Sequence, residues 1–216
     1  MENFSVLNYQ GSKNNLSSFI KKNIEPYIQD GKAILDIFSG SAAVSNMFRD
    51  NYQVYANDAE SYASIIADAI LNQADIDSAT ELINSLDIEY TTAIKKHAKP
   101  IIDFVKKEQL ALDKESYEQL IALYNLYPTV WNNQYSDITK SELTVDSIKQ
   151  TRDFYLFTTY YATNYYGITQ ALDIDCLIKI INLRFPQYRN ALLSCLFYAM
   201  TVSYTHLRAH ETSLHL

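Results

Sequence analysis

Two acidic side chains and a run of small residues make up the part of this sequence best suited to binding chemistry. An apolar stretch ends in Asp36-Ile37-Phe38-Ser39-Gly40-Ser41, and a second apolar stretch ends in Asp58. A turn of small residues lets a ligand approach the backbone, and the helix that follows offers N–H groups to an anion. A carboxylate such as that of Asp58 accepts hydrogen bonds from a ribose diol. The pattern therefore predicts an adenosine-type ligand.

The glycine content of this turn narrows the choice of ligand. A dinucleotide site needs the pattern G-x-G-x-x-G, whereas Gly40 is followed here by Ser41, Ala42 and Ala43. This disfavours a pyrophosphate and leaves S-adenosylmethionine, whose cationic sulfonium suits a carboxylate at Asp36. The structural alternative, that Asp36 and Asp58 only cap loops, stays open on these residues alone.

The elements that position these residues are predicted from hydrophobic spacing. Residues 16–28 have helical spacing, 33–38 form a short apolar strand that we expect to be buried, and 44–48 return to helical spacing. A second strand at 54–57 and a helix at 62–70 follow. This order of strand, turn, helix, strand and helix is the start of a doubly wound α/β domain.

The remainder of the chain is predicted to be helical, with faces at 82–86, 94–105 (interrupted by Pro100), 117–124, 145–155 and 188–199. The 216 residues include only 4 Gly and 4 Pro, which disfavours an all-β fold rich in turns. With 48% hydrophobic residues the chain is not intrinsically disordered, and the net charge of −7 excludes only a uniformly basic nucleic-acid binder.

Compartment and targeting are predicted from what the sequence lacks. The N-terminus has no signal-peptide pattern, and no apolar run is long enough to span a membrane. Cys176 and Cys195 have no metal-ligand spacing, which favours a reducing, cytoplasmic location. We therefore expect no membrane association and no metal.

The N-terminal motif Asn8-Tyr9-Gln10-Gly11-Ser12-Lys13 adds an aromatic ring and a lysine, which can pack beside and pair with a ligand carboxylate. This motif resembles the N-terminal motif of the Dam-like, D12 class adenine-specific DNA methyltransferases. The segments 36–44 and Tyr55-Ala56-Asn57-Asp58 resemble the first and second cofactor motifs of that family, in the same order. The strong resemblance covers residues 4–72. A weaker one covers 160–200, around Tyr165-Tyr166-Gly167 and 170–175. The family usually has a second glycine where this chain has Ala42.

The resemblance implies the fold, the cofactor and the reaction. We expect an incomplete, Rossmann-like S-adenosylmethionine-dependent methyltransferase domain, with few parallel strands, a large helical insertion and mostly helical residues. It implies methyl transfer to adenine N6 of double-stranded DNA by base flipping, as in restriction-modification systems, by an enzyme that is monomeric when intact. The implied cofactor residues are Tyr9, Lys13, Asp36, Phe38, Ser39, Gly40, Ser41, Asn57 and Asp58.

The catalytic motif of the resembling family, of the Asp-Pro-Pro-Tyr type, is missing from this sequence. The prolines are Pro26, Pro100, Pro128 and Pro186, so none are adjacent. We expect an inactive N-terminal fragment with no catalytic residues of its own, with cofactor-binding residues 1–74 and a helical target-recognition region at 75–202. Residues 203–216, with His206, His210 and His215, fit a metal tract or a frayed tail, but we interpret them as a non-native tail.

Two other functions remain open at this stage, together with two local hypotheses. A nicotinamide-dependent Rossmann oxidoreductase needs the glycine-rich turn that is missing, and a non-catalytic helical interaction protein predicts no cofactor affinity. The lysines at 95, 96, 99, 106 and 107 can contact DNA phosphates or form an ordinary solvated helix face. The tyrosines at 160, 161, 165 and 166 can line a base-binding cleft or pack in the core.

Overall fold

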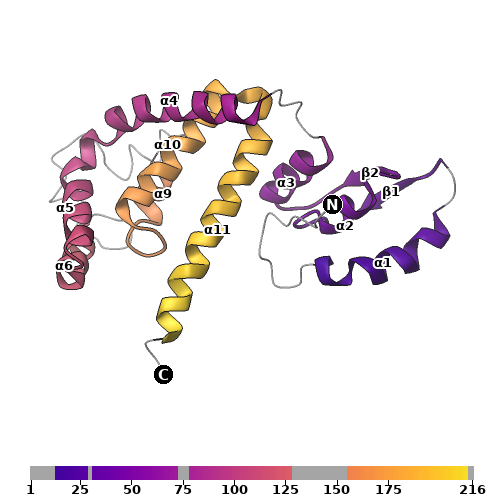
Figure 1. The fold of residues 1–216 in the computed structure, drawn as a ribbon, viewed down its shortest axis with the longest axis horizontal. Helices are drawn as coiled ribbons and strands as arrows, with labels where there is room; N and C mark the ends of the chain where they lie inside the picture. Colours follow the sequence, from indigo (N-terminus) through magenta and orange to yellow (C-terminus); the bar gives the residue numbers. More distant parts are fainter. Residues whose placement is uncertain (1–12, 29–30, 73–77, 128–154, 214–216) are drawn as a thin grey trace. The chain divides into compact units, whose positions relative to one another are not determined.

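The chain forms two compact units, and each is described by itself. The computed structural model describes residues 13–28, 31–72, 78–127 and 155–213 (Figure 1). Residues Met1–Ile76 and Gln187–Leu216 make up the first unit, and Asp77–Pro186 the second. The described residues are mostly helical and include one small parallel sheet of two strands. The functions predicted for 1–74, 75–202 and 203–216 stay predictions.

The first unit confirms the predicted order of strand, turn, helix, strand and helix. Its described elements are 3-10 helix η1 (Lys13–Leu16), α1 (Ser17–Ile24), η2 (Glu25–Tyr27), β1 (Ala33–Asp36), α2 (Ala43–Phe48), β2 (Gln53–Ala56), α3 (Ser61–Leu71) and α11 (Arg189–Ser213). The strands β1 and β2 pair in parallel, with Ala33 opposite Gln53 and Asp36 opposite Ala56. The carboxyl ends of both strands therefore lie at the same edge of the sheet.

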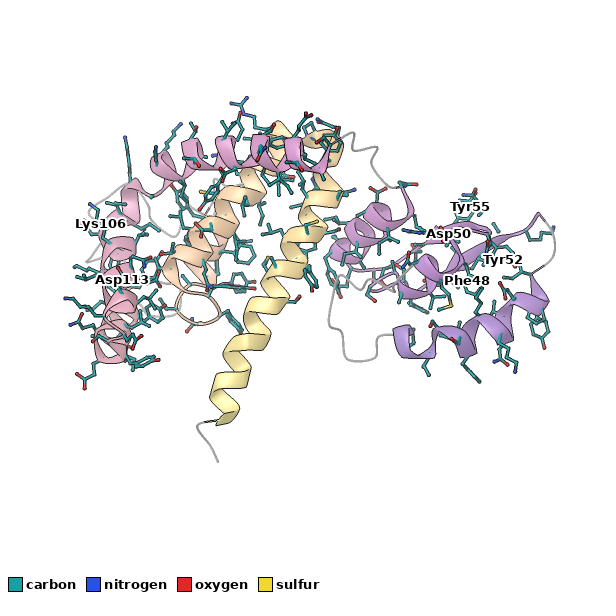
Figure 2. The ribbon with its side chains drawn as sticks, viewed as in Figure 1. Phe48, Asp50, Tyr52, Tyr55, Lys106 and Asp113 are labelled. Atoms are coloured by element: carbon teal, nitrogen blue, oxygen red, sulfur yellow. The ribbon has the colours of Figure 1, made fainter. Side chains whose placement is uncertain are left out.

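Among the described residues the sheet is covered on one side only, so the prediction of a buried strand at 33–38 is wrong. Side chains alternate along a strand, and α2 packs against both strands while α3 contacts β2. The opposite side carries Leu35 and Tyr55, which are 61% and 57% exposed. Figure 2 shows Tyr55 on the opposite side of the sheet from Phe48 of α2, which is fully buried. The apolar sequence predicted the strand correctly but not the absence of a covering layer among the described residues.

Helix α11 completes the core of the first unit from far along the sequence. Phe197 of α11 packs against the buried cluster of Ala42, Ile66 and Ala67. The Asn190 amide donates a 2.7 Å hydrogen bond to Asp68 of α3. Residues 187–202 therefore pack with the N-terminal elements, although the sequence analysis grouped them with the helical region. The same helix continues to Ser213, and the interpretation of 203–216 as a non-native tail stays a prediction.

The described elements of the second unit are all helical. They are α4 (Ala79–His97), η3 (Lys99–Ile101), α5 (Ile102–Asp113), α6 (Tyr117–Leu126), α9 (Leu156–Tyr160) and α10 (Ile168–Arg184), followed by η4 (Pro186–Tyr188) at the boundary. Pro100 lies in η3 between α4 and α5, where the sequence predicted an interruption. The predicted helix at 145–155 lies outside the described residues except for Tyr155.

Helix α10 is the centre of the second unit, and none of the predicted helical faces covers its residues. It packs against α4, α5 and α9, and it buries Ile168, Leu172, Cys176 and Ile181 among others. The full set of buried residues is spread around the helix axis, because neighbouring helices cover several sides: Ile168, Ala171, Leu172, Ile174, Asp175, Cys176, Ile180 and Ile181. Its apolar pattern is therefore spread around the helix rather than confined to one stripe.

Three further findings concern membranes, metals and thiols. Within the described ranges, no helix is long and apolar enough to cross a membrane. The same ranges contain no cluster of His, Cys, Asp or Glu that could hold a metal ion. Cys176 and Cys195 are free thiols, and burial raises the pKa of Cys176 to about 12.

Candidate functional site

The turns that follow β1 and β2 meet at the carboxyl edge of the sheet. The Asn57 N–H donates to the Asp36 carbonyl at 2.8 Å, and the Ser39 N–H donates to the Asn57 carbonyl at 3.1 Å. The Asn57 side-chain amide also donates to the Ile37 carbonyl at 3.3 Å. The strand pairing thus continues beyond the strands and brings the segments 36–41 and 57–58 together.

Asp58 holds the glycine turn directly. The Gly40 N–H donates a 2.8 Å hydrogen bond to Oδ2 of Asp58, and the Glu60 N–H donates a 3.0 Å bond to Oδ1. The bonds from Glu60 and Gly40 hold the pKa of Asp58 below its usual value, because both favour the charged form. Asp58 is therefore a carboxylate at neutral pH, and its remaining lone pairs are available to further donors.

Asp36 caps the helix that follows the turn. Its Oδ2 accepts hydrogen bonds from the Ser45 N–H at 3.2 Å and the Ser45 hydroxyl at 2.7 Å. Ser45 lies in the first turn of α2, where N–H groups have no partner within the helix. The expectation that this helix start offers free N–H groups to a ligand is therefore wrong for Ser45, because Asp36 occupies that donor.

The turn contains two residues in the left-handed backbone region. Gly40 has φ +49° and Ala42 has φ +56°. Glycine adopts this conformation at little cost, whereas an L-residue with a side chain is strained by about 1–2 kcal/mol. Ala42 is the position where the resembling family usually has glycine, and it is fully buried. The departure at Ala42 therefore places a side chain in a backbone conformation that costs local strain.

The remaining turn residues supply a buried hydroxyl and an exposed ring. Ser39 is 7% exposed, and its Oγ has no hydrogen-bond partner among the described residues. Phe38 is 88% exposed, so its ring face is available to a ligand. Ser41 is half-buried beside them.

The N-terminal motif is described only in part. Lys13 is exposed and is the first residue of η1. The helix η1 contacts α2, which is the helix that follows the glycine turn. The segment that carries Lys13 therefore lies beside the helix that Asp36 caps. Tyr9 lies outside the described residues.

The second unit contains a buried carboxylate, Glu108, that was not predicted from the sequence. Glu108 of α5 is 1% exposed, and it accepts hydrogen bonds from the Tyr124 hydroxyl and the Ile168 N–H, both at 2.7 Å. It also accepts bonds from the Thr169 N–H at 2.7 Å and the Thr169 hydroxyl at 2.6 Å. Glu108 thereby caps the start of α10. The sequence did carry a signal for this buried acid. Glu108 follows the apolar Ile101 and Val105 at helical spacing, which places its carboxylate on the packed face of α5.

Asp175 of α10 caps the start of α9 in the same way. It is 3% exposed and accepts 2.9 Å bonds from the Phe157 N–H, the Thr158 N–H and the Thr158 hydroxyl. Burial raises the pKa of Asp175 to about 6, against the opposing effect of these bonds. The two carboxylates therefore link α5 to α10 and α10 to α9.

The second unit also carries a stretch of exposed lysines. All five lysines singled out in the sequence are exposed, at 95 and 96 in α4, 99 in η3, and 106 and 107 in α5. Lys106 lies on the solvent side of α5 in Figure 2. Exposed ammonium groups of this density attract phosphates without reading a base sequence.

Comparison with known proteins gave a family and one relative. A family model described as D12 class N6 adenine-specific DNA methyltransferase matches residues 9–212. Modification methylase LlaI of Lactococcus lactis subsp. lactis is 24% identical over 103 residues, which is 48% of this chain and 15% of that relative. The match thus spans a small part of the relative's length. No solved structure matches this chain.

Proposed function

This chain belongs to the D12 class N6 adenine-specific DNA methyltransferase family, and from that premise we propose that its first unit binds S-adenosyl-L-methionine. We further propose that its second unit contacts double-stranded DNA. The reaction of the intact enzyme is then transfer of the sulfonium methyl group to adenine N6, with the adenine flipped out of the duplex. The domain that carries this chemistry is the Rossmann-like methyltransferase domain.

The cofactor proposal is supported by the donors and acceptors at the carboxyl edge of the sheet. S-adenosyl-L-methionine has a ribose diol, a cationic sulfonium and a carboxylate. Asp58 has lone pairs for the diol, and the unpartnered Ser39 hydroxyl needs a polar atom. A Cβ built on Gly40 meets nothing within 4 Å, so space is left beside the turn. These features fit the cofactor.

Each remaining cofactor residue has a proposed task. The ring of Phe38 packs against the adenine, and the charge of Asp36 favours the sulfonium even while one oxygen caps α2. Lys13 pairs with the ligand carboxylate, with Tyr9 packed beside it. Ser41 and Asn57 complete the walls of the site. When bound, the cofactor supplies an activated methyl group, and these residues bind and orient it.

The DNA proposal is supported by the family and by the exposed lysines at 95–107. Their contacts with phosphates fix the position of the protein on the duplex but do not select a sequence. Binding of this kind weakens steeply with salt, because each phosphate contact releases condensed counterions.

We propose that the chain as given binds these ligands without transferring the methyl group. The Asp-Pro-Pro-Tyr type motif, which holds the target adenine in the family, has no counterpart in the 216 residues. A labelled-methyl transfer assay on this exact polypeptide tests the proposal. Labelled DNA above the level of a no-enzyme control contradicts it.

The setting of the enzyme is proposed in the same way. We place the intact enzyme in the cytoplasm as a monomer, in a restriction-modification system, without a bound metal. The nicotinamide-dependent oxidoreductase and the non-catalytic interaction protein are both disfavoured by membership of a methyltransferase family.

The single observation that carries the cofactor proposal is the Gly40–Asp58 hydrogen bond, and it sets the experiment. Calorimetry on the full chain compares Asp58→Asn with Asp50→Asn, an exposed acid of the same unit labelled in Figure 2. We expect Asp58→Asn to weaken S-adenosyl-L-methionine binding by about tenfold or more, because a charged acceptor for the ribose is lost. Asp50→Asn should bind like wild type. Equal affinity of the two variants, or binding of NAD instead, contradicts the proposal.

A further inference from the structure

The loop between α9 and α10, residues 161–167, has a tightly fixed backbone. The Tyr161 carbonyl accepts hydrogen bonds from the N–H groups of Tyr165 at 3.0 Å and Tyr166 at 3.2 Å. The Thr163 N–H donates to the Tyr166 carbonyl at 2.7 Å, and Thr163 has φ +66°. A non-glycine residue in this region is held there by its surroundings, and such strain concentrates at functional sites.

Both ends of this loop are anchored by the two buried carboxylates. Asp175 fixes the N-terminal end through α9, and Glu108 fixes the C-terminal end through Ile168 and Thr169. A Cβ on Gly167 would lie 3.0 Å from Oε1 of Glu108, so even the packing beside the cap is tight. Burying two carboxylates costs desolvation, which the fold offsets with seven hydrogen bonds around one short loop.

The rings on the loop are ordered although two of them face solvent. Phe157 contacts Tyr161 with ring centroids 5.2 Å apart and Tyr166 with centroids 5.9 Å apart. Tyr161 contacts Tyr165 edge-on at 5.8 Å. Tyr161 and Tyr165 remain 39% and 50% exposed. The loop thus presents two adjacent tyrosine rings in defined orientations, with little freedom left to lose on binding.

We propose that Tyr161 and Tyr165 form a stacking surface for an unpaired nucleobase of DNA. The inference rests on the proposed DNA binding and names the part of the DNA that this loop contacts. Tyrosine rings that are already ordered stack on a base at small entropic cost, and every base has a face that can stack. The exposed lysines at 95–107 belong to the same unit and provide positive charge for phosphate contacts. An enzyme that flips its target base leaves a base without its partner in the duplex, and an aromatic surface can stack on that base.

The occupant is a base rather than an apolar protein segment because of the chemistry around the rings. Asn164, between the two tyrosines, is exposed and polar, and both tyrosines carry hydroxyl groups. The neighbouring Thr163 is polar as well. If a protein segment occupied this surface instead, the tyrosine variants in the experiment below would bind DNA as wild type does.

The test uses the full chain and a duplex oligonucleotide that carries 2-aminopurine, either paired or opposite an abasic site. We expect the wild-type protein to bind the abasic-site probe more tightly than the paired probe, with added quenching of the unpaired 2-aminopurine. Loss of one stacked base weakens binding by about tenfold, so Tyr161→Leu with Tyr165→Leu should remove this preference. Tyr161→Phe with Tyr165→Phe should keep it, because the rings remain.

Tyr117→Leu is the matched control, since Tyr117 is an exposed tyrosine of α6 in the same unit. It should keep both the preference and the quenching. Equal affinity of wild type for the two probes, or an unchanged preference in the double leucine variant, overturns the inference. If wild type binds neither probe, the DNA part of the proposed function fails as well. Paired-probe binding without a preference overturns the stacking surface alone. Should the double leucine variant not fold, Tyr165→Leu alone, at the more exposed of the two rings, takes its place with the same expected loss of preference.

Discussion

Replacing Glu108 by glutamine tests whether the buried carboxylate caps α10. The wild-type side chain accepts four hydrogen bonds, two of them from backbone N–H groups at the start of the helix. Glutamine has the same shape but only one acceptor oxygen. Its NH₂ group must therefore face donors that were bound to the carboxylate.

The expected loss follows from these four bonds. The remaining oxygen can keep the Tyr124 hydroxyl and the Ile168 N–H. The Thr169 hydroxyl can rotate and accept a bond from the new NH₂ group, but the Thr169 N–H cannot. One buried donor without a partner costs about 1–3 kcal/mol, partly offset because a charge no longer has to be buried. We expect Glu108→Gln to lower the free energy of unfolding by about 2 kcal/mol.

Urea unfolding followed by far-ultraviolet circular dichroism measures this loss, and hydrogen exchange localises it. Exchange should accelerate at the amides of Ile168 and Thr169 and stay unchanged in α3 of the first unit. Glu118→Gln, on the exposed face of α6, is the isosteric control and should change stability by less than about 0.5 kcal/mol. A Glu108→Gln protein as stable as this control, with unchanged exchange at both amides, would refute the reasoning.

Four further predictions concern other described residues. The folded-state pKa of Asp175, about 6, lies above the ordinary 3.8, so the folded chain holds this proton at pH values where the unfolded chain has lost it. The free energy of unfolding contributed by this group should fall as pH rises from about 4 to about 6, by up to about 3 kcal/mol. Asp175→Asn should flatten this pH dependence when unfolding is measured across that range. A variant whose free energy of unfolding depends on pH as steeply as that of wild type would contradict the prediction. Gly40→Ala should cost about 1 kcal/mol, because only backbone strain opposes it. The stability of Ala42→Gly should lie within about 1 kcal/mol of wild type, since relief of strain is offset by a lost buried methyl group and a more flexible unfolded chain. If thermal unfolding shows Gly40→Ala to be more stable than Ala42→Gly, the turn is not strained as described. Replacing Lys106 and Lys107 by glutamine should reduce the salt dependence of duplex binding, the slope of log K against log salt, by up to about 2, and an unchanged slope would remove both from the DNA contact.

The first unit could be predicted from the sequence as far as local patterns determine it. Two apolar stretches, each followed by polar residues, were enough to predict β1 and β2 and to single out Gly40 and Asp58, whose segments meet because parallel neighbours end at the same edge. Burial of the strand at Leu35 could not be predicted, since it depends on which elements cover the sheet. That Asp36 and Asp58 only cap loops was one of the open alternatives, and in the structure Asp36 caps the start of α2.

The second unit was harder to predict for a physical reason. Periodicity finds helices that have one apolar stripe and one polar face, whereas α10 is contacted on several sides and has no such stripe. The caps on α9 and α10 come from residues far away in sequence, such as Glu108 for Ile168. No local pattern predicts such a capping pair. An acid on the packed face of a helix nevertheless indicates that the acid has a buried partner elsewhere in the chain.

The discontinuity of the first unit has a consequence for biosynthesis. Its core needs Phe197, yet roughly 110 residues of the second unit are translated between α3 and α11. At about 5–20 residues per second, the ribosome needs on the order of ten seconds to deliver the missing helix. When α11 begins to be translated, every described helix of the second unit has been synthesised, whereas the N-terminal segment still exposes the apolar side at Ile66 that Phe197 covers in the folded unit. The later-encoded unit is therefore expected to fold first, and the earlier-encoded one to depend on chaperones until α11 emerges.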